Sequence, residues 1–337
     1  MAKSVKVAIV GATGFAGEKL IEILYRHPGA QMVNLSCIEG PRPVGEHYPR
    51  FNRLVDLDLE PINPEKINRL SDVVFLALPH TVSFNYVPLF LKHRKKVVDL
   101  SADYRLKDIA VYEKYYNVRH KDKKNIARAV YGLPELFRDE IRNADLIANP
   151  GCYPTVSALS LAPLVTKGLA DNVIIDAKSG VTGAGRKPHL DFHYTSINAN
   201  LYAYKLFKHQ HLPEINQTLS VLAGKPTKVL FTPHVVPLEQ GILATVYADL
   251  KKPFSTKDVL AMYQDFYRDD FFVRVLNNRL PKLKEVFNSN FCDIGLEVCG
   301  KKIIIVAAID NLMRGASSQA VQNMNLICGL DEKTGLL

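Results

Sequence analysis

A glycine-rich turn near the start of the chain constrains the fold more than any other feature of the sequence. The apolar run from Lys6 to Val10 leads into this turn, and an apolar helical pattern follows it as far as Leu24. Glycines spaced as G-x-x-G-x-x-G let the backbone turn tightly and approach a pyrophosphate, which the free N–H groups of the following helix then face. The pattern therefore predicts a strand–turn–helix unit that binds a dinucleotide. The residues expected to line the cofactor in this turn are Gly11, Thr13, Gly14, Phe15, Ala16 and Gly17.

Apolar runs alternate with helical patterns through the first 150 residues. Residues 31–36 are expected as the second strand. The run over residues 72–79 is as continuous as a strand covered on both faces requires, and residues 96–103 and 144–149 repeat its form. Strand, helix and strand at this spacing indicate a doubly wound parallel sheet.

The second half of the chain is richer in strands. A helix is expected over residues 155–165 and another over 316–328, but between residues 172 and 310 only one long helix is clear, over 255–268. Taken together, the two halves predict an α/β protein with a Rossmann-type dinucleotide-binding domain and an α+β catalytic domain whose sheet is mainly antiparallel. Strands of the second domain are expected over residues 172–179, 228–236, 241–250, 271–276, 294–298 and 302–309.

Composition and charge exclude several classes of protein. The 337 residues carry 43 Lys and Arg against 34 Asp and Glu, a formal net charge of +9, and the basic runs are short and lack interleaved aromatic residues. We therefore expect no nucleic-acid partner. The five cysteines match neither a disulfide framework nor a zinc pattern, so we expect no metal and a reducing, cytoplasmic compartment. Because the sequence shows neither a leader segment nor an apolar run of ~20 residues, we expect no membrane association.

The end of the second expected strand indicates which nicotinamide cofactor fits. An NAD site usually carries an acidic residue there, which holds the ribose 2′-hydroxyl. This strand ends in Ser36, which is small and neutral, and Arg42 follows shortly after. That combination suits a 2′-phosphate and predicts NADP, although Glu39 nearby would favour NAD.

The segment Asn149-Pro150-Gly151-Cys152-Tyr153-Pro154-Thr155 lies between the last strand of the first domain and a helix. A cysteine at a helix N-terminus has its thiolate stabilised by the helix dipole and by free N–H groups. The same N–H groups can hold an oxyanion. We therefore interpret Cys152 as a nucleophile and the other four cysteines as inert.

A second candidate segment contains His209, His211 and Glu214. Two histidines without a third ligand at a familiar spacing do not indicate a metal site. Thiolate chemistry needs a base that later acts as an acid, and histidine is the usual residue. Glu214 could orient the ring of His211, but spacing alone does not choose between the two histidines.

These motifs together resemble those of the N-acetyl-γ-glutamyl-phosphate reductases of arginine biosynthesis, which are related to the aspartate-semialdehyde dehydrogenases. The resemblance extends over essentially the whole chain. The form Gly-Cys-Tyr-Pro-Thr at 151–155 is typical of the arginine enzymes, whereas aspartate-semialdehyde dehydrogenases carry Asn-Cys there and the lysine-pathway relatives tend to lose Tyr-Pro. The matching segments lie at residues 11–17, 77–80, 99–106, 131–135, 149–155, 179–186, 209–214 and 308–312.

The resemblance implies roles for individual residues. Cys152 is then the nucleophile and His211 the acid/base, with Glu214 beside it. The resemblance further implies Pro79, His80 and Asn311 at the cofactor, and Ser101 and Arg105 at the phosphate. Apart from the resemblance, we expect Asn149 at the phosphate or the substrate, and Arg186 or Lys187 at the carboxylate of the substrate. The family often has a basic residue and Gly-Thr after Asn-Leu, where this chain has Met-Arg-Gly-Ala at 313–316.

The resemblance also implies the domain plan and the reaction. The last helix returns to the first domain, so residues 1–150 and 312–337 form the NADP-binding domain and 151–311 the catalytic and oligomerisation domain of a homo-oligomer, a dimer or tetramer. The implied reaction is NADPH-dependent reduction of N-acetyl-L-glutamyl 5-phosphate to the 5-semialdehyde, with release of phosphate, through a thioester on Cys152. Alternatives are the lysine-pathway reduction of a carrier-bound aminoadipyl phosphate, the aspartate-semialdehyde reaction, and an NADP-sensing regulator without catalysis.

Overall fold

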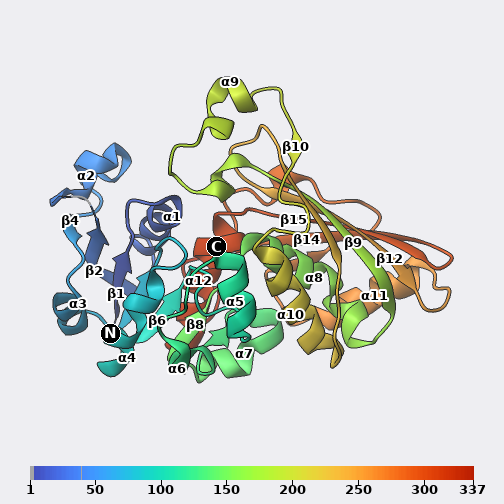
Figure 1. Ribbon diagram of the computed structural model, residues 1–337, viewed down its shortest axis with the longest axis horizontal. Coiled ribbons are helices and arrows are strands. Elements are labelled where there is room, and N and C mark those ends of the chain that lie inside the picture. The colour runs from blue at the N-terminus through green and yellow to red at the C-terminus, as the bar shows by residue number, and fades with distance from the viewer. Residues whose placement is uncertain (1–3, 39) are drawn as a thin grey trace. The chain divides into compact units, whose positions relative to one another are not determined.

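The computed structural model describes residues 4–38 and 40–337, and the chain divides into two compact units (Figure 1). The first unit takes in the described part of Met1–Pro150 together with Ala316–Leu337, and the second is Gly151–Gly315. The return to the first unit therefore comes at residue 316, four residues beyond the expected position. Within the described residues, no helix has both the length and the apolar character needed to cross a bilayer.

The first unit is built on an eight-stranded sheet with the order β3-β4-β2-β1-β5-β6-β8-β7. Neighbouring strands are parallel except for β3 and β4. The order reverses at β1, which lies between β2 and β5, and sheets of this kind bind ligands outside the carboxyl ends of the strands at such a point. The strands are β1 (Val5–Val10), β2 (Ala30–Cys37), β3 (Arg42–Pro43), β4 (Asp58–Pro61), β5 (Val73–Leu76), β6 (Lys96–Asp99), β7 (Val130–Tyr131) and β8 (Leu146–Ala148).

Helices cover both faces of this sheet. Ala8 and Val10 of β1 and Val74 and Leu76 of β5 belong to one buried cluster with residues of α3 and α4. The alternate residues of these strands point to the opposite face, where α12 packs against both α1 and α7. The helices of the unit are α1 (Phe15–Leu24), α2 (Val44–His47), α3 (Pro64–Leu70), α4 (Val87–Lys92), α5 (Ile109–Tyr116), α6 (Lys123–Ile126), α7 (Pro134–Arg142) and α12 (Ser318–Ile327).

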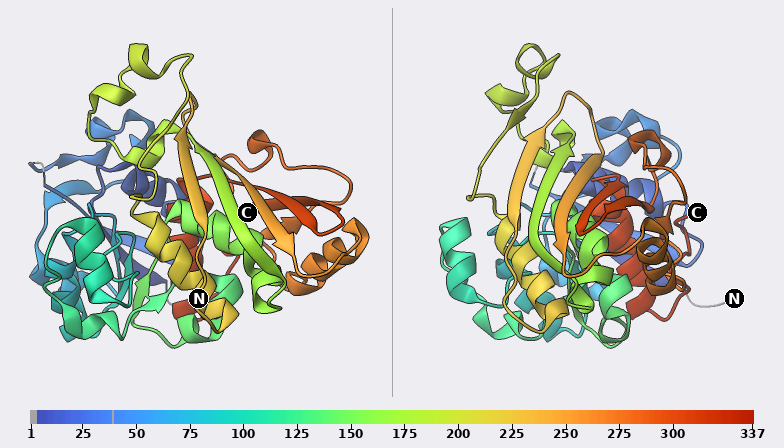
Figure 2. Two further views of the ribbon diagram at one scale, coloured as in Figure 1. Left: turned by 45° about the vertical axis from the view of Figure 1, so that its right-hand side comes forward. Right: turned by 90° about the vertical axis from the view of Figure 1, so that its right-hand side faces the viewer.

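The second unit is built on a seven-stranded sheet with the order β10-β11-β9-β12-β15-β14-β13 (Figure 2). Its pairs are antiparallel except β9–β11 and β13–β14. The predicted fold class is therefore confirmed, with two parallel pairs in the second sheet. The strands are β9 (Ala170–Ser179), β10 (Tyr202–Ala203), β11 (Leu230–Val235), β12 (Ile242–Leu250), β13 (Val273–Val275), β14 (Cys292–Cys299) and β15 (Lys302–Ile309).

Helix α8 (Cys152–Thr166) is the central helix of the second unit. Every residue from Tyr153 to Val165 is buried, because α8 packs on the sheet and is itself covered by α10 (His211–Ala223) and α11 (Thr256–Phe266). Pro163 lacks the N–H that would bond to the carbonyl of Leu159. The hydroxyl of Tyr267 donates to that carbonyl at 2.5 Å, so the interior proline leaves no carbonyl unsatisfied.

Two helices of the second unit differ from expectation. Helix α8 begins at Cys152 rather than near Thr155, since Pro154 is tolerated in the first turn of a helix, where the N–H groups have no intrahelical partner. Helix α10 was not expected, and Pro213 lies in its first turn. Its buried residues Leu212, Ile215 and Leu219 do follow helical spacing.

Candidate active site

The glycine turn after β1 has two glycines at which a methyl group would clash with the backbone and one at which it would fit. A methyl group at Gly11 would lie 2.3 Å from the carbonyl oxygen of Ala77, and one at Gly17 would lie 2.2 Å from that of Gly11. At Gly14 the nearest atom would be 3.6 Å away. The protein's own packing thus requires Gly11 and Gly17, whereas a methyl group at Gly14 would make only ordinary van der Waals contacts.

This turn fits a bound pyrophosphate. Gly14 is the N-cap of α1, and no side chain caps the helix, so its first N–H groups can face an anion. The carbonyl of Ser36 in β2 accepts bonds from the N–H groups of Gly11 (2.8 Å) and Ala12 (3.0 Å), which hold the turn at the sheet edge. Thr13 lies in the same turn, and Phe15 and Ala16 begin the helix.

At the end of β2 the structure differs in detail from the simple expectation. The side chain of Ser36 is fully buried, and its hydroxyl donates to Asn34 Oδ1 at 2.5 Å. Arg42 lies in β3, two strands away across β4, where it pairs with Leu59. Glu39, the residue that would favour NAD, lies outside the described residues.

The segments that follow β5 and β6 are tied together by hydrogen bonds. Ring nitrogen Nδ1 of His80, which follows Pro79, accepts from the N–H of Ala102 at 3.1 Å. The N–H of Thr81 donates to Asp103 Oδ1 at 2.7 Å. Strand β6 ends at Asp99, so residues 100–103, expected as strand, form the turn that makes these contacts.

Ser101 in this turn lies between Asp99 and Asp103, two buried acidic residues that the sequence reasoning did not single out. Its hydroxyl donates to Asp99 Oδ2 at 2.8 Å and accepts from the N–H of Asp103 at 3.1 Å. Burial, and then the charge of Asp103, raise the pKa of Asp99 to about 7. Asp103 accepts further bonds from the N–H of Phe84 and from the hydroxyl of Tyr112. A carboxylate pair at a sheet edge, spaced i and i+4, was the available signal.

Arg105 and Asn149 meet at the end of β8. The Nε of Arg105 donates to the carbonyl of Asn149 at 2.7 Å, and one of its Nη atoms donates to the carbonyl of Leu100 at 2.7 Å. The side chain of Asn149 donates to the carbonyl of Ala316 and accepts from Asn323. Two donors of Arg105 are therefore engaged by backbone carbonyls, which fixes the chain three residues before Cys152.

Cys152 is the first residue of α8, in the second unit. Gly151 is the N-cap, and no side chain caps the helix. The N–H of Gly151 donates to Glu214 Oε1 at 2.9 Å. Glu214 is 1% exposed and lies in the first turn of α10, so a buried carboxylate holds the backbone next to the thiol.

The two histidines have different surroundings. Nδ1 of His209 accepts from the N–H of His211 at 3.0 Å, and Nε2 lies 3.2 Å from the hydroxyl of Tyr204. His211 is the first residue of α10, one turn before Glu214, so both side chains lie on one side of that helix. The ring of Tyr153, directly after Cys152, packs against both imidazoles.

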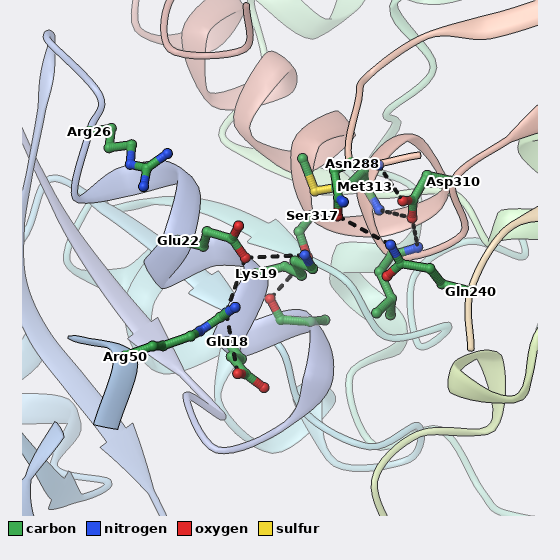
Figure 3. A network of polar contacts seen from close by, with 12 residues as sticks. Glu18, Lys19, Glu22, Arg26, Arg50, Gln240, Asn288, Asp310, Met313 and Ser317 are labelled. Carbon is green, nitrogen blue, oxygen red and sulfur yellow. Dashed lines mark hydrogen bonds and ion pairs between the residues drawn. The ribbon is translucent and has the colours of Figure 1, made fainter. Parts of the chain in front are cut away.

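Asp310 shapes a turn that lies against Cys152. Its carboxylate accepts from the N–H groups of Met313 at 3.1 Å and Asn288 at 2.8 Å (Figure 3). Its carbonyl accepts from the N–H of Gly315 at 2.9 Å. A methyl group at Gly315 would be 2.6 Å from Cys152 Cβ, so only glycine fits there. Sequence reasoning missed both Asp310 and Gly315.

The remaining expected site residues lie elsewhere in the second unit. Asn311 accepts from the N–H of Gly241 and donates to Thr182 Oγ1 at 3.1 Å, which braces the loop after β9. Arg186 is exposed and follows that loop. Among the described residues no group of histidine, cysteine, aspartate and glutamate is arranged to hold a metal ion.

Two family models match most of the chain. Residues 6–144 match the NAD binding domain of semialdehyde dehydrogenase, and residues 152–311 match its dimerisation domain. Among solved structures, aspartate semialdehyde dehydrogenase II of Vibrio cholerae has the same fold, with a TM-score of 0.74 at 16% identity over 97% of this chain and 99% of that one. The enzyme of Candida albicans, solved with NADP, gives a TM-score of 0.71 at 16% identity over 97% and 99%.

Sequence relatives narrow the family further. The chain is 47% identical to the N-acetyl-gamma-glutamyl-phosphate reductase of Pelotomaculum thermopropionicum, over 99% of this chain and 98% of that protein. It is 45% identical to the protein of that name from Methanococcus maripaludis, over 98% and 97%. The chain therefore belongs to the semialdehyde dehydrogenase family, and within it to the N-acetyl-gamma-glutamyl-phosphate reductases.

Proposed function

We propose that this chain reduces N-acetyl-L-glutamyl 5-phosphate to N-acetyl-L-glutamate 5-semialdehyde with NADPH and releases phosphate, as a cytoplasmic step of arginine biosynthesis. The observation that carries the proposal is Cys152 at the uncapped start of a buried helix, in a chain 47% identical to a reductase of that name. The substrate is a small acyl phosphate, and neither a metal nor a nucleic acid takes part.

The thiolate of Cys152 attacks the acyl carbon, and the C–O bond to phosphate breaks. This leaves a thioester on Cys152 and free phosphate. NADPH, when bound, supplies a hydride to the thioester carbon. The resulting oxyanion is held by N–H groups at the start of α8 and then expels the thiolate, which releases the aldehyde. The helix dipole favours negative charge on Cys152 at the beginning and end of this cycle.

His211 is assigned as the acid/base and Glu214 as its neighbour on α10. Proton transfer must reach the sulfur of Cys152 or the substrate oxygen, and a residue at the first position of α10, which packs on α8, suits that task. The bond from Gly151 to Glu214 gives the carboxylate a second task, since it fixes the backbone next to the nucleophile. His209 is not assigned the acid/base role, because its ring nitrogens face the N–H of His211 and the hydroxyl of Tyr204.

The first unit holds the cofactor in this proposal. The turn residues Gly11, Thr13 and Gly14, with Phe15, Ala16 and Gly17, take the pyrophosphate. Arg42 takes the 2′-phosphate and so selects NADP. Ser36 contributes through its carbonyl, which holds the turn. Pro79 and His80 of this unit are assigned to the cofactor as well, and the family resemblance adds Asn311 of the second unit.

Four residues are assigned to the phosphate or the substrate: Ser101, Arg105, Asn149 and Arg186. Arg105 donates to the carbonyls of Asn149 and Leu100, and its assignment to the phosphate rests on the planar guanidinium, which matches phosphate geometry. Arg186 is exposed and is assigned to the carboxylate of the substrate.

A second copy of the chain covers the outer face of the second sheet. Helices α8 and α11 pack on the other face. On the outer face Leu230, Ile174, Tyr247 and Ile304 are cross-strand neighbours in one row, each between 39% and 50% exposed. An exposed apolar row on a domain of the dimerisation type supports a homo-oligomer. Tyr247→Asp should lower the molar mass measured by light scattering.

The deciding experiment is phosphate-dependent reduction of NADP in the reverse direction. We expect turnover with N-acetylglutamate semialdehyde that exceeds turnover with aspartate semialdehyde or carrier-bound aminoadipate semialdehyde. Higher turnover with aspartate semialdehyde or carrier-bound aminoadipate semialdehyde would assign that reaction to the protein instead. Tight NADP binding without turnover on any of them would support a sensor and contradict the proposal.

A further inference from the structure

His209 lies inside a shell of aromatic rings in the second unit. Its ring centre is 5.4 Å from that of Tyr153, 5.4 Å from Tyr204, 5.5 Å from Phe231 and 4.9 Å from His211. The side chain is buried. Burial of this kind makes the hydrogen bonds of the imidazole the main determinant of its protonation and orientation.

The hydrogen bonds around His209 determine where each proton lies. The backbone N–H of His211 can only donate, so Nδ1 of His209 carries no proton and the neutral ring has its proton on Nε2. That proton faces the hydroxyl oxygen of Tyr204, which in turn donates to the hydroxyl of Tyr153 at 3.4 Å. Tyr153 donates to the carbonyl of His234 at 3.2 Å. Because a carbonyl only accepts, every bond in this hydrogen-bond chain donates in the same direction, from His209 through Tyr204 and Tyr153 to the carbonyl of His234.

Both hydroxyls in this chain stay protonated. Burial raises the pKa of Tyr204 to about 12, and a negative charge on Cys152 acts in the same direction. Burial also raises the pKa of Tyr153, with the charge of Cys152 again adding to the effect. The tyrosines are therefore neutral donors close enough to Cys152 to sense its charge.

We propose that Tyr153, Tyr204 and His209 are positioning residues. The two tyrosines hold the imidazole of His209 in its neutral form with the proton on Nε2, and Nδ1 of that ring then accepts the bond from the backbone N–H of His211. The chain thereby connects the second residue of α8, next to Cys152, with the first residue of α10. This inference rests on the proposed function, in which Cys152 and His211 react with the same substrate.

Two substitutions of His209 separate positioning from the alternatives. Asn at 209 keeps an acceptor that can bond to the N–H two residues on, as asparagine does in Asx turns, but it cannot transfer a proton. Leu keeps the apolar packing and loses the acceptor. We expect His209→Asn to retain kcat within about threefold, and His209→Leu to lose roughly 10–100-fold in kcat, because a displaced catalytic group costs that much.

Other patterns of kcat overturn the proposal. Equal large losses in both variants would mean that His209 itself transfers protons. Full activity in His209→Leu would mean that the ring only fills space. The dissociation constant for NADPH serves as the check on each variant, and it should stay unchanged.

Tyr204→Phe tests the next bond of the chain, with Tyr202→Phe as the matched control. Tyr202 lies two residues earlier, in β10, outside the chain of bonds. Loss of the Tyr204 hydroxyl should lower kcat with little change in KM and should move the pH profile of kcat, whereas Tyr202→Phe should change neither. Equal behaviour of the two variants would contradict the assignment.

A spectroscopic arm needs no turnover, so its failure differs from failure of the proposed reaction. In protein with ¹⁵N-labelled histidine, long-range ¹H–¹⁵N spectra should show His209 with a bare Nδ1 and a protonated Nε2 at neutral pH. Tyr204→Phe should broaden or shift the Nε2 signal of His209 more than any other histidine signal. A protonated Nδ1 in the wild-type protein would overturn the inference.

Discussion

Helices α1 and α8 begin in nearly the same way and are used differently. Each follows a parallel strand, and each has a glycine N-cap in an extended conformation: Gly14 has φ −78° and ψ 165°, and Gly151 has φ −71° and ψ 158°. Neither helix is capped by a side chain. Both starts therefore leave N–H groups available to an anion.

The difference lies in what surrounds the two helix starts. Helix α1 is partly exposed and carries ion pairs at its outer side, where Arg50 lies between Glu18 and Glu22 (Figure 3). Helix α8 is buried on all sides, and the buried carboxylate of Glu214 holds the N–H of its N-cap. An open helix start is suited to a ligand that comes and goes, whereas an enclosed one is suited to a fixed nucleophile whose position must be exact to a fraction of an ångström.

The largest expected effect comes from the thiol at the start of α8. Cys152→Ser should lower kcat by ~10⁴–10⁶-fold, because the hydroxyl is a far weaker nucleophile, while NADPH binding is retained. Single-turnover kinetics and fluorescence titration measure the two quantities. Mapping of iodoacetamide labelling should find Cys152 first, and preferential labelling of Cys37 or Cys328 with retained activity would contradict the assignment.

The next largest effect is expected at His211, the first residue of α10. His211→Asn should lower kcat by ~10²–10⁴-fold and flatten the pH profile near neutrality, because it removes a general acid/base. The measurement is the pH dependence of kcat, with thermal melting as the control for folding. An unchanged pH profile, or normal kcat in a less stable protein, would make His211 a structural residue.

The glycine turn before α1 offers a matched pair of substitutions. Gly17→Ala should lower the free energy of unfolding by about 1–3 kcal/mol or more, because its methyl group would lie 2.2 Å from the carbonyl oxygen of Gly11. Gly14→Ala should leave stability nearly unchanged, because its methyl group would make only ordinary van der Waals contacts. It should weaken NADPH binding roughly tenfold, because the methyl group would hinder the close approach of the backbone to the pyrophosphate. Urea unfolding and cofactor titration test both, and equal behaviour of the two variants would remove the distinction between packing and binding glycines.

The carboxylate pair at the sheet edge of the first unit should respond to pH. Folding raises the pKa of Asp99 to about 7, so its contribution to stability is fully present below the ordinary pKa near 4 and is lost as pH rises toward 7. Asp99→Asn removes this loss, and its amide oxygen can still accept the bond from the N–H of Ser101 while its NH2 group faces the Ser101 hydroxyl. The free energy of unfolding of the variant relative to wild type should therefore rise between pH 4 and 7, by at most about 1.4 kcal/mol per pH unit.

Asp249 serves as the control for this experiment, because its contribution to stability depends on pH in the opposite direction. Hydrogen bonds from Lys302 and Asn172 lower the pKa of Asp249 in the second unit. Its contribution to stability is present above its unfolded pKa and is lost as pH falls through the lowered value. At neutral pH, Asp249→Asn should therefore be less stable than wild type, and this difference should shrink as the pH falls. If the difference in stability between Asp99→Asn and wild type stays constant over pH 4–7, Asp99 is ionised in the folded protein.

The smallest effect is expected at the 2′-phosphate. Arg42→Ala should weaken NADPH binding about tenfold and leave NADH binding nearly unchanged, since only NADPH carries the group that pairs with a guanidinium. Titration by cofactor fluorescence measures both constants without turnover. Equal losses for the two cofactors would mean that Arg42 serves only the fold.

Several features could be predicted from the sequence because their causes are local. The spacing of Gly11, Gly14 and Gly17 predicts a tight strand-to-helix turn, because backbone sterics act over a few residues. Helix α10 was not predicted, although Leu212, Ile215 and Leu219 follow helical spacing and Pro213 lies in the first turn, where proline is tolerated.

The sequence by itself determined the kind of fold, the glycine turn and the choice of Cys152 as the candidate nucleophile. Only the tertiary structure decided which distant residues support them. Glu214 meets the N–H of Gly151 across 63 residues, and Gly315 lies against Cys152 from the far end of the unit. The hydroxyl of Ser36 donates its hydrogen bond to the side chain of Asn34 inside the sheet. Such contacts depend on how whole elements pack, and packing brings together side chains whose separation along the chain carries no periodic or local signal.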